Sequence, residues 1–375
     1  MYDVVVVGGN LAGATAAIQA SKFGAKVVLI EKKKEVLFPP RCGEATDKIT
    51  AEILELEKIG CPINPIKQIS LNISSKKEFN FKFKKHAIFI IDRYFLESYL
   101  LKNAKENKII TKIGYKVVDY KAPNDVILDD GEIIKGKIII DASGINCQIG
   151  KKIGFKTKLE PSDIGVCIQS RVEGNFNPDV MKMWSHKPYA PFGYAWLFPK
   201  SKKLANIGIG IPGDQKVDLA SLLQRYIENE THYKYKIVNT FRSCVPSSKP
   251  MSTLTNDNVM IVGDAARLAN PLLENGINTA VFSGTVAGIT AAKYIKGIVP
   301  RLDIYDSLMR SKVERLTKAY LQKHKLNSEE KFIKYYLRMF SILNSLNKLF
   351  PNILQNQLLK IVKKDKKIID SLKNC

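Results

Sequence analysis

The sequence predicts a mixed α/β fold with three parts: a Rossmann-type domain, an antiparallel-sheet domain and a C-terminal helical region. Three observations support this fold class. The first 31 residues follow the order strand, glycine-containing turn, helix and strand. Residues 164–242 consist mostly of strand-like segments. Residues 301–375 are lysine-rich and carry apolar side chains at helical spacing.

The N-terminal unit starts with Asp3–Val7, a valine-rich run typical of a buried parallel strand. The turn Gly8-Gly9-Asn10-Leu11-Ala12-Gly13 follows, and then a helix of small residues over 14–23. A second buried strand, Lys26–Ile30, ends on Glu31, eighteen residues after Gly13. The start of a helix favours an anion, and an acid at this distance can accept hydrogen bonds from ribose hydroxyls. This order of elements predicts dinucleotide binding.

Asn10 occupies the place of the second glycine in the usual G-x-G-x-x-G turn, where a missing Cβ lets the backbone approach a pyrophosphate. Asparagine is the next residue to tolerate a left-handed backbone, and its amide can donate to a phosphate. Two interpretations follow, a tolerated substitution that weakens affinity or an inactive site. We favour the first, because the other residues of the pattern are present further along the chain.

Composition narrows the class of protein. The 375 residues suffice for two or three domains, and 45% hydrophobic with 25% charged residues is ordinary for a globular protein. The net charge of +23 is unusual, and it is spread along the chain. A basic surface attracts phosphorylated cofactors, nucleic acid and acidic lipid head groups, although lysine richness also arises from genome-wide bias. No aromatic-interleaved basic motif is present, so nucleic acid is not expected as a partner.

Cysteine usage and hydropathy suggest a location. The six cysteines form no C-x-x-C pair, and with only four histidines no metal site is expected. The pattern suits a reducing cytosol. A signal peptide is not expected, because the first strand begins at once and contains Asp3. The sequence contains no run of eighteen apolar residues, so no membrane span is predicted. We therefore expect a cytoplasmic protein.

A loop is predicted over 36–45 by two prolines and a glycine, and a helix over about 46–59 follows it. A loop after the second strand of such a fold lies near the bound ligand. Cys42 is therefore a candidate functional residue, and the alternative is a small packed side chain. Residues 69–74 and 78–83 alternate apolar and polar residues around a turn, which predicts an antiparallel hairpin.

A strand over 87–91 leads into a helix for which Asp92 is a plausible N-cap. Arg93 in the first turn opposes the helix dipole, so we expect it either to reach an anion or to be a solvated surface residue. A buried strand over 137–140 ends in Asp141-Ala142-Ser143-Gly144, where small residues let a ligand or loop approach the backbone. Further short strands are predicted at 108–113, 116–120 and 125–128, the last followed by a hairpin turn at 129–131.

The predicted antiparallel domain holds strands at 164–172, 194–198 and 204–211, and a helix at 218–228. Large aromatic side chains alternate along the second of these strands, at Tyr194, Trp196 and Phe198. Aromatic residues on a strand usually form core, but they also make the walls of apolar pockets. From the local context we favour core.

A last buried strand is predicted over 259–262 and ends in Gly263-Asp264-Ala265-Ala266, where the acid can bind a sugar-like hydroxyl. A long helix of small residues begins near Gly276, and its N-terminus offers a positive end to a negative group. In the C-terminal region, one apolar stripe favours packing against the main body over a membrane face. This stripe consists of Tyr335, Met339, Leu343, Leu346 and Phe350.

Four pieces in order carry a resemblance: the N-terminal unit with Glu31, Arg93 after a strand, the segment 141–144, and the segment 263–276. They resemble the FAD-binding module of the flavoprotein family that includes p-hydroxybenzoate hydroxylase. Within it, the chain most resembles the geranylgeranyl reductases, such as the archaeal digeranylgeranylglycerophospholipid reductases, which saturate isoprenoid chains. Three stretches point to this subgroup of the family: PRCGE at 40–44, YAWLFP at 194–199 and GDAARLANPL at 263–272. The resemblance covers about 1–310.

The resemblance implies FAD as cofactor. Gly8, Gly13 and Glu31 would hold its ADP half, Arg93 and Asp264 its phosphate and ribityl regions, and the N–H groups of 275–277 its flavin edge. The full set of expected cofactor-binding residues is Gly8, Asn10, Leu11, Ala12, Gly13, Glu31, Lys32, Arg41, Cys42, Gly43, Arg93, Val117, Gly144, Asp264, Gly276 and Ile277. The expected substrate-binding residues are Tyr194, Trp196, Phe198 and Pro271, the aromatic ones lining a prenyl tunnel rather than filling a core. The sequence departs from the family pattern at Asn10 and at 272–275, where relatives commonly carry a glycine-rich turn.

The implied domains are a discontinuous FAD-binding domain over 1–60, 87–155 and 250–300, an antiparallel-sheet substrate domain over 61–86 and 156–249, and a helical region over 301–375. The implied reaction reduces C=C bonds of geranylgeranyl chains, as in membrane lipid precursors, by hydride from flavin N5 and a proton. An isolated alkene has no carbonyl to polarise it, so the proton donor must be close while water is excluded. Cys42, and after it Glu44, are the expected catalytic residues.

The expected partners are a prenyl lipid, an anionic membrane surface bound peripherally, and an electron donor such as NAD(P)H, ferredoxin or another reduced carrier. Two other functions stay open: an FAD-dependent monooxygenase or halogenase of an aromatic substrate, and a basic flavin-binding protein that docks on anionic membrane or nucleic acid. The mass of the product distinguishes the monooxygenase from the reductase, because the monooxygenase product gains one oxygen and the reductase product gains two hydrogens. Salt-dependent binding without substrate-dependent flavin oxidation would indicate the second.

Overall fold

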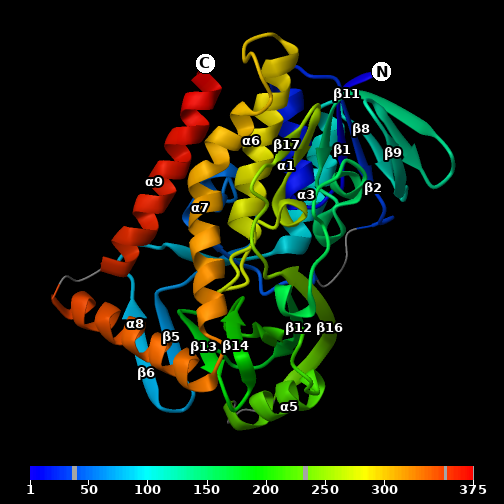
Figure 1. Ribbon diagram of the computed structural model, residues 1–375. Coiled ribbons are helices and arrows are strands. Elements are labelled where there is room, and N and C mark those ends of the chain that lie inside the picture. The colour runs from blue at the N-terminus through cyan, green and yellow to red at the C-terminus, as the bar shows by residue number, and fades with distance from the viewer. Residues whose placement is uncertain (36–39, 231–234, 350–352, 375) are drawn as a thin grey trace.

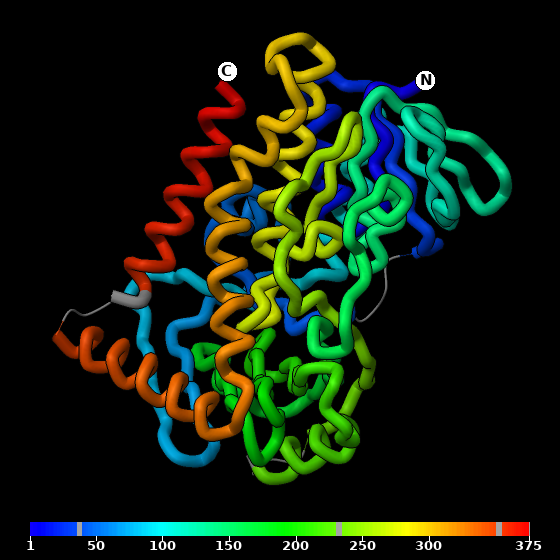
Figure 2. Tube along the Cα trace, in the orientation of Figure 1, coloured from blue at the N-terminus to red at the C-terminus, as the bar shows by residue number. Residues whose placement is uncertain are grey.

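The computed structural model describes residues 1–35, 40–230, 235–349 and 353–374 (Figure 1). A mostly parallel sheet flanked by helices forms one end of the molecule, and a mostly antiparallel sheet forms the other. The Cα trace crosses between the two ends several times, so that segments distant in sequence share each end (Figure 2). The mixed α/β fold class predicted from the sequence is therefore confirmed.

The first sheet has the strand order β17-β18-β11-β1-β2-β8, and the pairs along this order are parallel except β17 with β18. β10 (Asp125–Leu128) and β9 (Val117–Lys121) extend it from β11 by antiparallel pairing. Its pairing places Val7 of β1 opposite both Ile30 of β2 and Asp141 of β11. The strands are β1 (Tyr2–Val7), β2 (Val27–Glu31), β8 (Ile110–Ile113), β11 (Ile133–Asp141), β17 (Thr255–Asn256) and β18 (Val259–Ile261). The carboxyl ends of β1, β2, β11 and β18 meet at one edge, where folds of this class bind ligands.

Alternating residues of β1 pack against different layers. Val4 and Val6 belong to the apolar cluster formed with α1, α3 and α6, whereas Val5 and Val7 pack with β9, β10 and α4. These elements are α1 (Leu11–Lys22), α3 (Arg93–Glu106), α4 (Gln148–Lys152), α6 (Ile277–Ile295), β9 (Val117–Lys121) and β10 (Asp125–Leu128). The 3₁₀ turns η1 (Gly144–Asn146) and η3 (Gly263–Ala266) follow β11 and β18. The valine run is buried on both faces, as the sequence predicts.

α1 and α6 touch through their backbones. A Cβ atom on Gly284 would lie 2.2 Å from the Ala12 carbonyl oxygen, and one on Gly288 would lie 2.3 Å from that of Ala16. Glycine at these two positions of α6 is therefore what allows the helices to lie so close.

The second sheet has the order β16-β12-β15-β14-β13-β5-β6 and is antiparallel except for the pair β13 and β5. Its strands are β5 (Gln68–Ile73), β6 (Lys77–Lys82), β12 (Ile164–Glu173), β13 (Val180–His186), β14 (Ala190–Pro199), β15 (Leu204–Pro212) and β16 (Lys236–Pro246). Helix α5 (Leu219–Glu230) packs on β12 and β15, and the turn η2 (Pro161–Asp163) precedes β12. β13 was not predicted as a separate strand.

A small sheet, β3-β7-β4, lies between these parts. It comprises β3 (Ala45–Asp47), β4 (Ile63–Pro65) and β7 (Ile88–Ile91), and β3 leads into α2 (Lys48–Ile53). The helix predicted over 46–59 is thus shorter and starts later. The cause is local: Asp47 Oδ1 accepts a hydrogen bond from the Thr50 N–H at 3.1 Å and caps the helix there. Of the loop predicted over 36–45, residues 36–39 lie outside the described ranges.

The C-terminal helices are α7 (Ile304–Lys325), α8 (Glu329–Leu349) and α9 (Ile353–Asn374). α7 packs on α6, α9 packs on α2 and α6, and α8 packs on β5 and β6. Tyr335, Met339 and Leu343 pack into the apolar cluster of β5 and β6, as predicted for the stripe; its last residue, Phe350, lies outside the described ranges. Among the described residues, no helix combines the length and the apolar character needed to span a bilayer.

Candidate active site

The turn after β1 is built around two glycines. Gly8 has a φ of +105°, and a Cβ there would lie 2.3 Å from the Ala142 carbonyl oxygen. A Cβ on Gly13 would lie 1.8 Å from the carbonyl oxygen of Gly8, so Gly13 serves the close packing of helix on turn and does not line the cavity. Asn10 has a φ of −73° and needs no left-handed backbone, contrary to the reason we gave for tolerating it. It caps α1 without a side-chain cap bond and lines the cavity.

Glu31 holds this turn in place. Its carboxylate accepts hydrogen bonds from the Gly9 N–H at 2.6 Å and from the Lys33 N–H at 2.9 Å. The carboxylate therefore fixes the turn from the end of the neighbouring strand and also lines the cavity.

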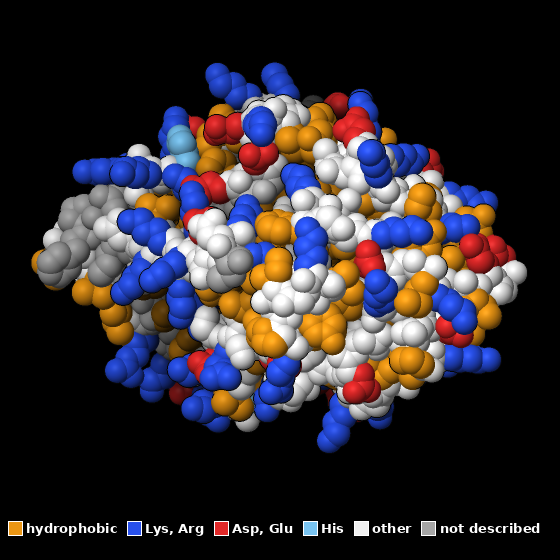
Figure 3. Space-filling view, turned by 90° about the horizontal axis from the view of Figure 1, so that it is seen from above, with side chains coloured by type: hydrophobic (Ala, Val, Ile, Leu, Met, Phe, Trp, Pro, Cys, Tyr) orange, Lys and Arg blue, Asp and Glu red, His pale blue; other side chains and the backbone are white. Residues whose placement is uncertain are grey.

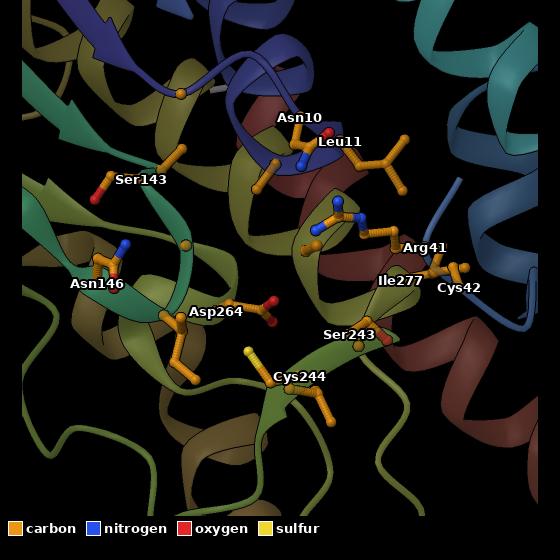
Figure 4. A pocket seen from close by; sticks show the side chains of 18 of the residues that line it. Asn10, Leu11, Arg41, Cys42, Ser143, Asn146, Ser243, Cys244, Asp264 and Ile277 are labelled. Carbon is orange, nitrogen blue, oxygen red and sulfur yellow. The ribbon is translucent and has the colours of Figure 1, made fainter. Parts of the chain in front are cut away.

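A single cavity of about 430 Å³ extends from this turn to the antiparallel sheet. Its lining combines the carboxyl ends of β1 and β2, the turns η1 and η3, the start of α6, the loop at 41–43, and strands β12, β14 and β16 (Figure 4). The predicted residues that line it are Gly8, Asn10, Leu11, Ala12, Glu31, Lys32, Arg41, Cys42, Gly43, Arg93, Val117, Gly144, Tyr194, Trp196, Phe198, Asp264, Gly276 and Ile277. Gly13, Glu44 and Pro271 were also predicted at the site, and the structure places them outside the lining.

Arg93 and Asp264 bring opposite charges to the cavity. Asp92 caps α3 by accepting a hydrogen bond from the Phe95 N–H, as predicted, and Arg93 pairs with Glu97 one turn further on. The Nε of Arg93 is buried without a hydrogen-bond partner among the described residues. Burial opposes the charge of Arg93, but Glu97 and Cys42 raise its pKa above the usual value. Burial raises the pKa of Asp264, and Arg93 partly opposes this.

Cys42 presents a thiol beside Arg93. Its Sγ accepts a hydrogen bond from the Glu44 N–H at 3.2 Å, and its carbonyl accepts one from Gln169 Nε2 at 3.0 Å. The side chain is half-buried and lines the cavity. The loop is therefore tied to β12, which fixes the position of the thiol.

Glu44 does not face the cavity. The side chain is fully buried, and its carboxylate accepts hydrogen bonds from Arg171 Nη2 at 2.6 Å, Lys200 Nζ at 2.9 Å and Asn206 Nδ2 at 2.7 Å. Its other oxygen accepts from the Arg93 N–H at 2.9 Å. Two cations hold the carboxylate, so it anchors the loop to β12, to β15 and to Lys200 just after β14, and Glu44, predicted as the second catalytic residue, lies outside the cavity lining.

The aromatic residues of β14 satisfy both interpretations of the sequence. Trp196 and Phe198 are only 5% and 6% exposed and pack on each other at 6.0 Å between ring centroids, yet both line the cavity with Tyr194. The indole N–H donates to Gln169 Oε1 at 3.0 Å, and the Tyr194 hydroxyl donates to the Leu273 carbonyl at 2.8 Å. Pro271 is instead buried behind the wall, where its carbonyl accepts a hydrogen bond from the Ser247 hydroxyl.

The sequence did not point to several lining residues. Cys167 and Gln169 lie two residues apart on β12 and therefore share one face of the strand. The sequence predicted this strand, but which of its faces points into the cavity depends on the neighbouring strands of the sheet. Cys244 comes from β16, which pairs with β12, and lines the same cavity as Asp264 (Figure 4). Glu274 lines the cavity from the segment that we had noted as a departure from the family pattern. Within the described ranges, no group of three or more His, Cys, Asp or Glu residues is arranged to hold a metal.

Comparisons with known proteins agree with this arrangement. The geranylgeranyl reductase catalytic domain family matches residues 163–245, and the FAD dependent oxidoreductase family matches residues 3–36. The chain is 31% identical over 355 residues to digeranylgeranylglycerophospholipid reductase of Thermoplasma acidophilum, which covers 87% of this chain and 86% of the relative. The chain belongs to the geranylgeranyl reductase family of FAD-dependent oxidoreductases.

Other relatives support the family assignment. Digeranylgeranylglycerophospholipid reductase 1 of Methanococcoides burtonii is 30% identical over 308 residues, covering 78% of this chain and 75% of the relative. The crystal structure of a geranylgeranyl bacteriochlorophyll reductase-like protein from T. acidophilum aligns with a TM-score of 0.82 at 27% identity, over 100% of this chain and 98% of that one. The flavin-dependent brominase Bmp2 shares the fold, with a TM-score of 0.75 at 16% identity over 100% and 98% of the two chains.

The residues of this geranylgeranyl reductase family member fit its cofactor. Gly8 and its neighbour Ala142 leave no room for a side chain, which lets a pyrophosphate approach the backbone at the start of α1. The unpartnered Nε of Arg93 borders the same cavity and is a donor available to a phosphate or ribityl oxygen. The start of α6 adds a second positive helix end. The cavity therefore offers the donors that an FAD molecule requires along its length.

Proposed function

We propose that this chain reduces the C=C double bonds of geranylgeranyl chains, of the kind carried by membrane lipid precursors, with FAD as its cofactor. One observation carries the proposal: a single cavity joins the cofactor-type residues of the Rossmann-type end to the aromatic residues of β14. Relatives named digeranylgeranylglycerophospholipid reductase, at about 30% identity, support the substrate class. A continuous cavity would let the alkene reach the cofactor without entering water.

The cofactor would be held from three sides. Gly8, Asn10 and Glu31, together with the first turn of α1, would bind the ADP half. Arg93 and Asp264 would bind the central phosphate and ribityl region. The N–H groups of Gly276 and Ile277 at the start of α6 would face the flavin edge that becomes electron-rich on reduction. Lys32, Arg41, Gly43, Val117 and Gly144 would complete the lining.

Bound FAD supplies a hydride from N5 of its reduced form. The chain must supply the remaining proton and an apolar surface for the alkene. Tyr194, Trp196 and Phe198 provide that surface, because the hydroxyl of Tyr194 and the indole N–H of Trp196 are hydrogen-bonded to the protein. The Cys42 thiol would donate its proton from Sγ to the substrate carbon. Arg93 beside it would stabilise the thiolate that remains.

Mass analysis of products tests this function. The holoprotein is reduced anaerobically with dithionite, excess reductant is removed, and geranylgeranyl phospholipid is added. We expect flavin absorbance to return and the product to gain two hydrogens per double bond reduced. Flavin that no prenyl lipid reoxidises would refute the proposal. Product formation with one added oxygen under air would instead indicate the monooxygenase class.

We also propose peripheral binding to an anionic membrane on the cytoplasmic side and reduction by an external carrier such as NAD(P)H or ferredoxin. The net charge of +23 supports the membrane surface, and Figure 3 shows lysine and arginine side chains spread over one whole face. The rate at which NADH, NADPH and reduced ferredoxin each bleach the flavin identifies the donor. A carrier that bleaches it no faster than buffer alone is excluded.

A further inference from the structure

Glu274 brings a carboxylate into the cavity that Cys42 also lines. It lies between η3 and α6 with a φ of +49°, and its oxygens rest on the backbone of β12 and β15. A Cβ on Gly165 would lie 2.4 Å from its Oε1, and one on Gly210 would lie 3.2 Å from its Oε2. The same point on Gly210 is 3.1 Å from Cys167 Sγ and 3.6 Å from the Trp196 ring. The carboxylate, a thiol and the indole therefore meet at one place on the cavity wall.

The surroundings of Glu274 suit an acid that titrates near neutrality. Burial raises the pKa of Glu274 to about 7, opposed by the Lys323 ammonium and the Ser247 hydroxyl. The other titratable groups facing it are Cys167, Tyr194 and Tyr336, on β12, β14 and α8. Burial, and next to it neighbouring negative charge, raise their pKa values, so these three stay protonated at pH 7.

Polar groups lead from Glu274 to α7. Lys323 Nζ donates to the Ser247 hydroxyl at 2.9 Å, and to the carbonyls of Ser247 and Ser162 at 2.8 Å each. The Ser247 hydroxyl is fully buried, donates to the Pro271 carbonyl at 3.0 Å and lies close enough to Glu274 to lower the pKa of that carboxyl. Burial lowers the pKa of Lys323, with Glu274 opposing, so this ammonium gives up a proton more readily than a surface lysine. Lys323 is half-buried, so solvent reaches part of this residue.

We propose that Glu274 stores a proton at the cavity and returns it to Cys42 after each reduction, and that Ser247 and Lys323 resupply Glu274. The proposal rests on the proposed function, because alkene reduction is the step that consumes the proton. Protonated Glu274 gives its proton to the Cys42 thiolate, directly or through one water, and becomes a carboxylate. The Ser247 hydroxyl then turns from the Pro271 carbonyl toward Glu274, gives its proton to that carboxylate and takes one from the Lys323 ammonium. Lys323 recovers its proton from solvent.

The first test needs no substrate. The absorption spectrum of the FAD-loaded protein is recorded from pH 5 to 9 for the parent, Glu274→Gln, Glu274→Asp and Lys323→Gln. Glu160→Gln is the control, since Glu160 is an exposed acid paired only with Lys158. We expect an inflection near pH 7 that is kept in the control and in Glu274→Asp and is lost in Glu274→Gln. Lys323→Gln should move the inflection upward, because a nearby cation favours the carboxylate.

The second test separates storage from donation. In a single turnover, Glu274→Gln should reoxidise the flavin within twofold of the parent, because the one proton that this turnover consumes comes from Cys42 and needs no resupply. With excess dithionite and lipid, its steady-state rate should fall more than tenfold, as expected for loss of general acid–base function. Ser247→Ala should lower the steady-state rate in the same way.

Two results would overturn the assignment: an inflection near pH 7 that persists in Glu274→Gln, or a steady-state rate of that variant equal to the parent's. A parent protein that reduces no prenyl lipid would contradict the proposed function instead. The spectral titration would then still decide whether Glu274 titrates in the cavity.

Discussion

Replacing Glu44 with glutamine tests whether its carboxylate anchors the 41–44 loop or acts as an acid. The variant keeps the shape of the side chain and removes its charge, leaving Arg171 and Lys200, which are 4% and 9% exposed, without their shared partner. Breaking a buried ion pair on one side costs about 3–5 kcal/mol. Lys200 retains Asp92 at 3.5 Å, which offsets part of the loss. We therefore expect the free energy of unfolding to fall by about 3 kcal/mol.

Urea unfolding followed by circular dichroism measures this loss, provided that the slope of the free energy of unfolding against urea concentration is the same in both proteins. Glu52→Gln is the matched control, because Glu52 makes solvent-accessible ion pairs, with Lys48 at 3.8 Å and Lys366 at 3.5 Å, and its loss should change stability by less than about 1 kcal/mol. The folded fraction of Glu44→Gln should complete a single flavin turnover at a rate within a few-fold of the parent. A loss below about 1 kcal/mol would refute the anchor. An unchanged stability with a single-turnover rate lowered over a hundredfold would restore Glu44 as an acid.

Four further predictions concern the cavity and the surface. Cys42→Ser should bind FAD normally but slow single-turnover reoxidation by more than tenfold, and a rate within twofold would return Cys42 to a packing role. Gly8→Ala should abolish FAD binding in a fluorescence titration, because its Cβ would lie 2.3 Å from the Ala142 oxygen; normal affinity would contradict the turn geometry. Glu274 has its pKa raised from 4.5 to about 7, so its protonated form is favoured by folding and stability is lost as pH rises through this range. Glu274→Gln should thus gain up to about 3 kcal/mol over the parent at pH 8 and little at pH 4.5 in urea unfolding, and an equal difference at both pH values would contradict the shift. Co-sedimentation should be strong with anionic vesicles at low salt and weak at high salt, and equal binding to neutral vesicles would exclude an electrostatic mode.

Elements whose structure depends on residues close by in the sequence could be predicted from local sequence patterns. The valine run, the glycine turn, Asp92 as a cap and the start of α6 are each set by neighbours in sequence, and the structure has them where predicted. The helix after the 41–44 loop was overextended, because a capping Asp47 inside a helical pattern fixes a later start. β13 was not predicted, although it pairs with β14, the next strand in the chain; its other partner, β5, lies far earlier in the sequence.

The site was predictable only where its residues follow a strand or open a helix. Glu44 was placed at the cavity by its proximity to Cys42 in sequence, but its partners Arg171, Lys200 and Asn206 are more than a hundred residues away and turn it inward. Glu274 became an acid of the cavity through Gly165 and Gly210, whose missing side chains make room for it. Such roles depend on tertiary contacts that no local pattern encodes.

The backbone contact between α1 and α6 sets a length scale for whatever binds at their ends. Ala12 meets Gly284 and Ala16 meets Gly288, so the helices run side by side in the same direction and Leu11 is level with Ser283. α6 begins at Ile277, six residues earlier, which at 1.5 Å per residue places its N-terminus about 9 Å beyond that of α1. The positive N-terminal ends of the two helices are thereby held at a fixed distance from each other. A ligand can bind both helix ends only if it is extended and carries negative charge at two points separated by that distance. A bulkier residue at 284 or 288 would move the two helices, and with them their N-termini, apart.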